Sequence, residues 1–341
     1  METRTELSTI GEFGLIKRIA EKFPIVQSGS IKGIGDDAAV VDTEGKKLLI
    51  STDLLMEGVH FDLAYTPLRH LGYKAVAVNV SDIAAMNGIP NQITVSLGLS
   101  NRFSVEAIEE LYEGIKIACE EYNIDLIGGD TSSSRGGLAI SITVLGTADE
   151  NQIVYRNTAQ KGDIVCVTGD LGAAFMGLQV LEREKQVFMA NPDMQPELSD
   201  KDYVVERQLK PTARMDVIHE LRALDVIPTA MIDVSDGLAA ELLHICKNSG
   251  IGGVIFEDKM PIDDQTYLTG TELNFSPMTA ALNGGEDYEL LFTVSQEDYQ
   301  KIEQVSEITP IGYITNEVEG AHIMMKSGSL VKLTSPGYEH F

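Results

Sequence analysis

Segments typical of β-strands alternate with segments typical of α-helices along most of the chain. Runs that are rich in β-branched residues and bounded by Gly, Asp or Asn occupy residues 47–52, 91–99, 138–147 and 163–168. Apolar residues at helical spacing occupy residues 68–87, 104–122 and 238–249. Long helices mixed with strands are typical of layered proteins, so the pattern predicts a mixed α/β (α+β) fold.

The chain of 341 residues is long enough for two domains. The sequence changes from strand-like and helix-like segments to a polar segment near residues 149–162. This change predicts domains of residues 1–150 and 151–341. Residues 79–85 and 233–239 share the pattern Asn/Asp-Val-Ser-Asp-x-x-Ala, one copy in each half. We interpret this repeat as a sign of duplication, in which case the two domains have related folds. Residues 183–202 form a polar insertion, either a lid or a surface loop.

The charge of the chain limits its partners. Lys and Arg number 26 against 52 Asp and Glu, a formal net charge of −26. Nucleic acid and anionic membranes are therefore not expected as partners, because their phosphates would be repelled. The first residues contain acids and no continuous apolar core, so we expect no signal peptide or membrane span and a cytoplasmic protein. Three separated cysteines in apolar contexts predict buried free thiols.

Carboxylates recur at the ends of apolar or small-residue runs. The acids in these positions are Asp37, Asp53, Asp82, Asp130, Asp170 and Asp236, with Glu286 and Asp287 in a further Gly-Gly-Glu-Asp segment. Any one of them could be a turn former or a helix cap. As a set, acids that follow strands converge at one sheet edge, where their repulsion must be relieved by cations. Oxygen ligands suit Mg²⁺, which binds carboxylates together with substrate phosphates, so the set predicts several ions and a polyphosphate.

Other well-known motifs are missing from the sequence or fit it poorly. There is no Walker-type phosphate loop. Residues 33–38 satisfy Gly-x-Gly-x-x-Ala, but no convincing strand runs into them and Asp36 and Asp37 would repel a bare pyrophosphate. No nucleophile set is apparent, so we expect no catalytic side-chain nucleophile or base. For His60, close to Asp53, a functional and a structural role remain equally open.

A series of motifs resembles the thiamine-monophosphate kinases in composition and order, over nearly the whole chain. The motifs are GIGDDAAVV, STDLLMEGVHF, AVNVSDIAAMNGIP, LIGGDTS, YRNTAQKGD, VTGDLGAA, IDVSDGL, NGGEDYELLF and GYEHF. Several are shared with a wider superfamily that includes aminoimidazole ribonucleotide synthetase, selenophosphate synthetase and a hydrogenase maturation protein. The forms STD…EGVHF and GGEDYELLF are specific to the kinases.

The resemblance implies an N-terminal α/β domain whose strands form a β-barrel across a homodimer interface, and a C-terminal α/β domain. It implies ATP-dependent, Mg²⁺-assisted conversion of thiamine monophosphate to thiamine diphosphate. The implied magnesium ligands are Asp37, Ser51, Thr52, Asp53, Asp82, Asp130, Asp233 and Asp236. The implied ATP contacts are Tyr112, Gly129, Asp130, Arg156 and Ser235, and the implied thiamine-phosphate contacts are His60, Glu286 and Phe341.

Several points stay open after the resemblance. Tyr112 could pack inside a helix layer instead of contacting ATP, Asp36 could serve only the turn, and Asp170 and Arg135 have no assigned role. A purine-pathway ring-forming ligase of the same superfamily, or a non-catalytic metal or nucleotide sensor, remains an alternative. Direct in-line attack by a phosphate oxygen would need no strong general base, which agrees with the missing nucleophile set.

Overall fold

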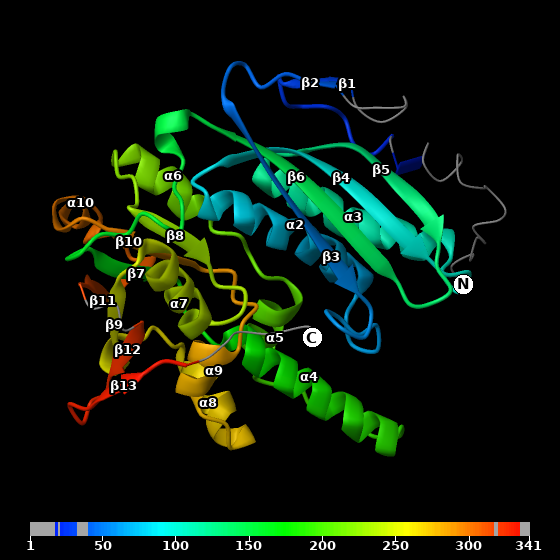
Figure 1. The fold of residues 1–341 in the computed structure, drawn as a ribbon. Helices are drawn as coiled ribbons and strands as arrows, with labels where there is room; N and C mark the ends of the chain where they lie inside the picture. Colours follow the sequence, from blue (N-terminus) through cyan, green and yellow to red (C-terminus); the bar gives the residue numbers. More distant parts are fainter. Residues whose placement is uncertain (1–17, 20, 33–39, 317–319, 335–341) are drawn as a thin grey trace. The chain divides into compact units, whose positions relative to one another are not determined.

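The computed structural model describes residues 18–19, 21–32, 40–316 and 320–334. The chain divides into two compact units, one comprising the residues up to Ile83 with Gly88–Asn151, the other Ala84–Asn87 with the residues from Gln152 onward. Each unit contains its own β-sheet with helices packed on it (Figure 1). The mixed α/β fold class predicted from the sequence is therefore confirmed.

A four-stranded sheet, in the order β3-β6-β4-β5, forms the centre of the first unit. The elements are β1 (Ser30–Lys32), β2 (Val40–Val41), β3 (Lys47–Met56), α2 (Leu68–Ala85), β4 (Ile89–Leu99), α3 (Val105–Tyr122), β5 (Asp125–Ser133) and β6 (Ala139–Ala148). Helices α2 and α3 lie along one face of the sheet (Figure 1). Strands β4 and β5 are parallel, whereas β3 and β4 each pair with β6 in antiparallel register.

The two faces of strand β3 differ in their surroundings. Its burial alternates along the strand, as the pleat of a β-strand requires. Leu55 is buried on the helix-covered side, whereas Leu48, Ile50 and Leu54 on the other side are 41%, 62% and 55% exposed. An apolar face of the sheet is thus open to solvent in the single chain.

A seven-stranded sheet, in the order β13-β12-β9-β11-β7-β10-β8, forms the second unit. Its strands are β7 (Ile164–Thr168), β8 (Ala230–Asp233), β9 (Gly252–Phe256), β10 (Leu290–Val294), β11 (Ile308–Thr315), β12 (Ala321–Met324) and β13 (Leu330–Lys332). Its helices are α4 (Ala173–Ala190), α5 (Asp202–Leu209), α6 (Met215–Ala223), α7 (Leu238–Ser249), α8 (Asp264–Leu273), α9 (Pro277–Asn283) and α10 (Gln296–Ile302). Short 3₁₀ turns occupy Glu150–Gln152 and Glu257–Lys259. An apolar core containing Val167, Ile232 and Leu291 joins the sheet to α7.

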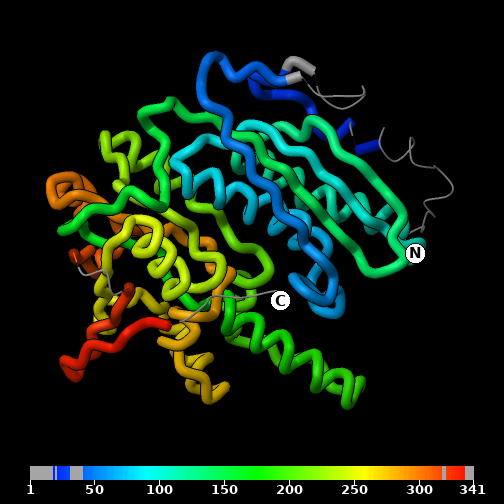
Figure 2. Tube along the Cα trace, in the orientation of Figure 1, coloured from blue at the N-terminus to red at the C-terminus, as the bar shows by residue number. Residues whose placement is uncertain are grey.

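The first part of the polar insertion predicted at residues 183–202 is helical. Helix α4 continues through Ala190, and Figure 2 shows the trace turning back from its end into α5. The prediction missed this because the exposed end of α4 carries charged residues on several sides. Glu184 fixes the return by accepting a 2.8 Å hydrogen bond from the backbone N–H of Glu197.

The repeated pattern of residues 79–85 and 233–239 has two different local structures. The first copy lies inside helix α2, whereas the second leaves strand β8, turns, and enters helix α7. The two copies differ from their first residue, because Asn79 is helical whereas Asp233 ends a strand, and after the shared aspartate Gly237 adopts a φ of 106° where Ile83 continues the helix. The sequence likeness therefore does not reflect equivalent structural positions.

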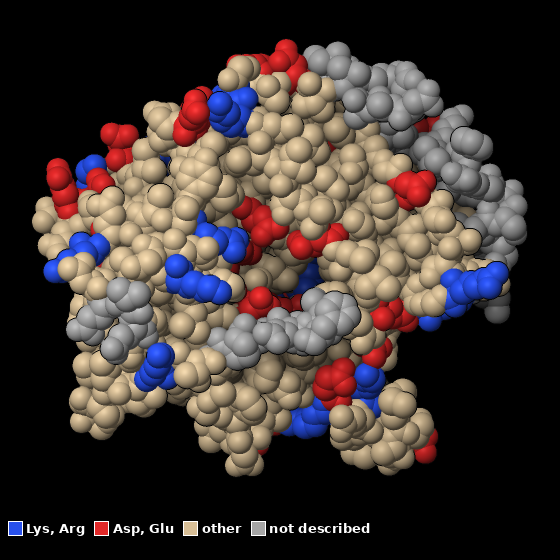
Figure 3. Space-filling model, in the orientation of Figure 1, with Lys and Arg blue, Asp and Glu red and all other residues tan. Residues whose placement is uncertain are grey.

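Charged side chains are mixed on the face of the molecule shown in Figure 3. Acidic and basic groups are interspersed there, and the described residues of that face form no broad basic area. Within the described segments, no helix has the length and apolarity needed to cross a membrane. All three cysteines are buried and free, as predicted, and burial raises the pKa of the Cys246 thiol to about 11.

Candidate functional site

The first group of predicted metal ligands lies where strand β3 runs beside helix α2. Ser51 and Asp53 are on the half-buried face of the strand, and Asp82 is in the last turn of the helix. The Ser51 hydroxyl donates a hydrogen bond to Oδ2 of Asp82. The backbone N–H of Asp53 donates to Oδ1 of Asn79 at 3.0 Å. The fold thus brings together Ser51, Asp53 and Asp82, as the set of ligands requires.

These positions correct the expectation that the acids follow strands. Asp53 lies inside β3, because that strand pairs with β6 along its whole length from Lys47 to Met56. Asp82 lies within a helix, and Asp130 lies within strand β5. In the second unit, Asp170 and Asp236 come shortly after strands, in the turns that follow β7 and β8.

The surroundings of Asp53 disfavour the charged form of its carboxyl group. Burial, together with the negative charge of Asp82, raises its pKa from 3.8 to about 6. A divalent cation beside Asp53 and Asp82 would relieve both effects. The hydroxyl and carboxylate oxygens of Ser51, Asp53 and Asp82 are the donors that Mg²⁺ prefers, so this group fits such an ion.

Two other predicted ligands of the first unit lie elsewhere on the sheet. Thr52 alternates to the opposite face of β3, where its hydroxyl donates to the Ile142 carbonyl at 3.0 Å. Asp130 is exposed on β5, at the opposite edge of the sheet from β3. Over the part of the chain that the structure describes, no cluster of three or more His, Cys, Asp or Glu side chains could hold a metal.

Gly129, a predicted ATP contact, has a clear backbone requirement. A Cβ atom at this position would lie 1.9 Å from the Val95 carbonyl oxygen on the neighbouring strand β4. Only glycine therefore fits at this position. Because Gly129 has no side chain, its backbone is accessible next to Asp130.

Tyr112 and His60 have contrasting environments. Tyr112 is 6% exposed in α3 and packs edge-on against Phe23, with ring centroids 6.3 Å apart. Its surroundings favour the packing alternative over a direct ATP contact. His60 is half-buried, and its Nδ1 accepts a 3.0 Å hydrogen bond from the Met56 backbone N–H. Because Nδ1 is an acceptor, the ring proton is on Nε2.

The second unit carries its predicted residues on two adjoining turns. Asp233 ends strand β8, and Ser235 and Asp236 form the turn into α7. Glu241, in the first turn of α7, accepts hydrogen bonds from the Ser235 hydroxyl at 3.4 Å and the Asp236 N–H at 3.2 Å. Burial raises the pKa of Glu241 to about 7, and the hydrogen bond from the Asp236 N–H opposes that shift more than the Asp236 charge adds to it.

Glu286 lies in the other turn, next to Ser235. Its backbone N–H donates to the Ser235 carbonyl at 2.8 Å, and that of Tyr288 donates to the Val234 carbonyl at 2.9 Å. Gly285, Glu286 and Tyr288 all have positive φ, of 70°, 60° and 53°. A predicted ATP contact and a predicted substrate contact are therefore joined by main-chain hydrogen bonds within one unit.

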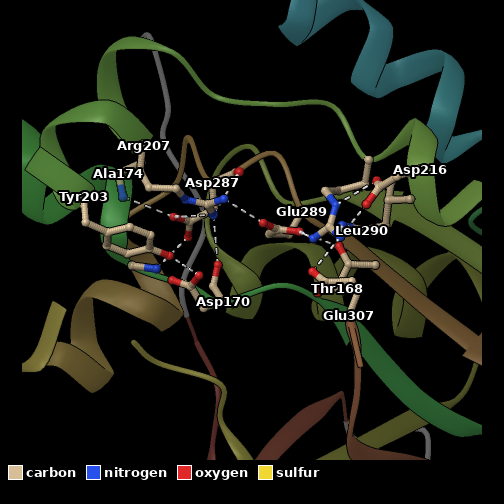
Figure 4. A network of polar contacts seen from close by, with 12 residues as sticks. Thr168, Asp170, Ala174, Tyr203, Arg207, Asp216, Asp287, Glu289, Leu290 and Glu307 are labelled. Carbon is tan, nitrogen blue, oxygen red and sulfur yellow. Dashed lines mark hydrogen bonds and ion pairs between the residues drawn. The ribbon is translucent and has the colours of Figure 1, made fainter. Parts of the chain in front are cut away.

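Buried charges support this strained turn, as Figure 4 shows. The fully buried Glu289 accepts bonds from Arg207 at 2.8 Å, Arg214 at 2.7 Å and the Thr168 hydroxyl at 2.6 Å. Asp287 accepts from the N–H groups of Gly172 and Ala174 at the start of α4. The pKa of the Asp287 carboxyl is raised by burial, and Arg207 opposes that shift.

This support was not predicted from the sequence. Arg207, Gln208 and Arg214 lie outside the motifs quoted above, and Glu289, although it is part of GGEDYELLF, received no role of its own. The partners of these residues are distant in the chain. Asp170, which had no assigned role, accepts a hydrogen bond from the Tyr203 hydroxyl. The positions of Asp36, Asp37 and Phe341 lie outside the described residues.

Two family models match most of the chain. The "AIR synthase related protein, N-terminal domain" matches residues 35–148, and the "AIR synthase related protein, C-terminal domain" matches residues 160–324. Among curated proteins, the thiamine-monophosphate kinase of Aquifex aeolicus is 36% identical, over 98% of this chain and 99% of its own. That of Bacillus subtilis is 37% identical, over 97% and 99%.

Solved structures show the same similarity. The thiamine-monophosphate kinase from Stenotrophomonas maltophilia superposes with a TM-score of 0.79 at 34% identity, over 92% of this chain and 96% of its own. The structure described as "AaThiL complexed with AMPPCP and TMP" superposes with a TM-score of 0.75 at 33% identity, over 100% of both chains. A hydrogenase maturation protein, HypE, shares the fold at 17% identity, with a TM-score of 0.72.

Proposed function

Because this chain belongs to the thiamine-monophosphate kinase family, we propose that it transfers a phosphoryl group from ATP to thiamine monophosphate, forming thiamine diphosphate. The similarity to kinases over 97–98% of the chain, at 36–37% identity, is the observation that carries this proposal. It does not favour the ring-forming ligase or the non-catalytic sensor. ATP and thiamine monophosphate are accordingly the small-molecule partners, and the cytoplasm, which supplies ATP, is the proposed location.

The proposed reaction does not require the protein to form a covalent bond with the substrate. The nucleophile is a phosphate oxygen, which is ionised near neutral pH, so no side chain has to remove a proton. Catalysis consists of orienting two anions and neutralising their charge. The proposed site residues fit this kind of catalysis. They are mainly acids and backbone groups, and they do not include a side-chain nucleophile paired with a general base.

We assign Mg²⁺ binding to the oxygen donors of both units. The proposed ligands are Asp37, Ser51, Thr52, Asp53, Asp82, Asp130, Asp233 and Asp236. The raised pKa of Asp53, beside Asp82, supports the assignment, because this carboxylate gains most from a cation. Bound Mg²⁺ would supply positive charge for the phosphates of ATP. Thr52 fits least well, since its side chain is on the opposite face of β3 from Asp53.

The remaining proposed contacts divide between the two substrates. Gly129, Asp130, Arg156 and Ser235 are assigned to ATP, with the exposed Arg156 guanidinium providing positive charge. For Tyr112, its contact with Phe23 supports packing in the helix layer over contact with ATP. His60, Glu286 and Phe341 are assigned to thiamine monophosphate, whose thiazolium ring is a cation that a carboxylate attracts. The Nε2 proton of His60 makes this ring a hydrogen-bond donor.

We also propose a homodimer in which the open face of the four-stranded sheet closes into a barrel with a second copy. The exposed Leu48, Ile50 and Leu54 on one side of β3 support this assembly. Monomeric proteins rarely leave a contiguous apolar face of a sheet in water. Two such faces packed together would bury these side chains without any change in the single chain.

One assay tests the function. Purified protein is incubated with ATP, Mg²⁺ and thiamine monophosphate, and thiamine diphosphate is measured by chromatography after oxidation to its fluorescent thiochrome. Product formation that needs all three components is the expected result. ATP binding without thiamine diphosphate formation would instead indicate a sensor, and activity on a purine-pathway amide would indicate the ligase.

A further inference from the structure

Glu286 is followed in the same turn by two acids, Asp287 and Glu289, whose side chains are buried. Asp287 and Glu289 are buried, whereas Glu286 and Tyr288 are half-buried on the alternate positions of the same turn. The two buried acids are fixed by Arg207 and Arg214 and by the start of helix α4. Their anchoring sets the path of the main chain, and hence the side to which Glu286 points.

Helix α5 supplies the partner of Glu286 itself. Arg207 donates to Glu289 at 2.8 Å and to the Asp170 carbonyl at 3.0 Å. The next residue, Gln208, is 5% exposed and donates from Nε2 to Oε2 of Glu286 at 2.7 Å. Two consecutive residues of one helix therefore bind two acids of the turn in different ways, Arg207 binding Glu289 by charge and Gln208 binding Glu286 by an uncharged amide.

The position of Gln208 is fixed by close packing of its helix. A Cβ atom on Gly177 of α4 would lie 1.9 Å from the Val204 carbonyl oxygen of α5, so the two helices are in backbone contact. Tyr203, one turn before Arg207, hydrogen-bonds to Asp170. The amide of Gln208 is thus presented by a rigid support, which lowers the entropic cost of orienting Glu286.

We propose that Gln208 is a specificity-determining positioning residue for the cationic ring of the acceptor substrate. Its amide fixes the Glu286 carboxylate without adding a positive charge, so the carboxylate keeps its attraction for a thiazolium. An arginine in the same place would fix the carboxylate equally well but would cancel that attraction. This inference rests on the proposed function, because it concerns how the kinase site selects a cationic phosphate ester.

Two variants separate orientation from charge. Gln208→Met keeps the length of the side chain and removes the donor, and Gln208→Arg keeps a donor and adds a charge. The exposed Gln186 on α4 provides the matched control, Gln186→Met. Each purified protein is first compared by circular dichroism and thermal melting, and KM is then measured separately for thiamine monophosphate and for ATP.

For Gln208→Met we expect KM for thiamine monophosphate to rise about tenfold while KM for ATP stays within about twofold, the loss typical of one hydrogen bond to a charged group. In a Glu286→Gln background the same change should have almost no further effect, because the two residues act as one unit. Equal increases in both KM values, or fully additive effects of the two substitutions, would overturn the proposal.

Gln208→Arg tests the selection for charge and remains informative even if Gln208→Met is unstable. Binding of thiamine monophosphate is compared, by calorimetry without ATP, with binding of the phosphate ester whose thiazole ring carries no charge. We expect the wild-type preference for the cation to fall about tenfold in Gln208→Arg and to persist in Gln186→Met. An unchanged preference would contradict the proposal, whereas a wild-type protein that makes no thiamine diphosphate would contradict the proposed function instead.

Discussion

The hydroxyl of Ser51 on strand β3 donates to the carboxylate of Asp82 on helix α2. This bond holds one acid while its neighbour, Asp53, is left in a buried setting that raises its pKa to about 6. Two neighbouring carboxylates in this setting favour a bound cation, at a cost to the metal-free fold. Proteins commonly accept such a cost where a site must bind tightly.

Asp53→Asn should abolish most activity while leaving the fold intact. Removal of one charge-stabilising group commonly lowers kcat by about 100-fold or more, and we expect at least that loss at saturating ATP and thiamine monophosphate. The measurement is a steady-state assay with Mg²⁺ varied, and the exposed Asp258 provides the control as Asp258→Asn. If Asp53→Asn had wild-type activity at the same Mg²⁺ concentration, the assignment of Asp53 as a metal ligand would be wrong.

The same residue predicts a pH dependence of stability in metal-free protein. A carboxyl whose folded pKa is raised from 3.8 to about 6 binds its proton more tightly when folded. Its contribution to the unfolding free energy is therefore present below about pH 4 and is lost as the pH rises through about 6. Relative to Asp53→Asn, the wild type should lose about 1–2 kcal/mol across this window. Urea titrations at several pH values, with chelator present, measure the difference, and parallel curves for both proteins would contradict it.

Glu289→Ala should destabilise the second unit strongly. The substitution leaves Arg207 and Arg214 buried without the carboxylate that joins them, a change that costs about 3–5 kcal/mol in comparable buried pairs. Chemical denaturation followed by circular dichroism measures the loss. The exposed Glu303 on the same unit serves as control, and Glu303→Ala should change stability by less than about 0.5 kcal/mol.

Ile50→Asp should separate the proposed dimer into folded monomers. Ile50 is 62% exposed in the single chain, so the substitution disturbs no core but places a charge in the face proposed to be shared. Analytical ultracentrifugation over a range of concentrations gives the association state. Leu268→Asp, at a 68% exposed position on α8, should leave the dimer unchanged. A wild type that sediments as a monomer would refute the assembly itself.

Local patterns in the sequence predicted the regular elements well. The helix expected at residues 238–249 is α7, Leu238–Ser249, and the strand expected at 138–147 is β6, Ala139–Ala148. Hydrophobic periodicity succeeds here because each element buries one face. It also succeeded around Asp82, where the helical spacing predicted at residues 68–87 is α2, Leu68–Ala85. The separate expectation that the acid closing each apolar run follows a strand was wrong there, because Asp82 lies inside this helix.

The supports of the candidate site could not be predicted in this way. Gln208 and Glu286 are 78 residues apart in the chain, and a glutamine among charged neighbours carries no motif. Glu289 lies at the start of a strand-like segment, and nothing in that segment indicates that its carboxylate binds Arg207 and Arg214. Such pairings depend on how α5 packs on α4, which is a property of the tertiary structure.

Strand β3 alternates between a polar set, Ser51 and Asp53, and an apolar set, Ile50 and Leu54. If one residue were inserted in the turn before Lys47 and the strand slipped by one position against β6, the two sets would exchange faces. The proposed cation ligands Ser51 and Asp53 would then face the open side of the sheet, and the apolar side chains Ile50 and Leu54 would face α2. An insertion that shifted the register of β3 by one residue would therefore disrupt the proposed metal site and the proposed dimer interface together.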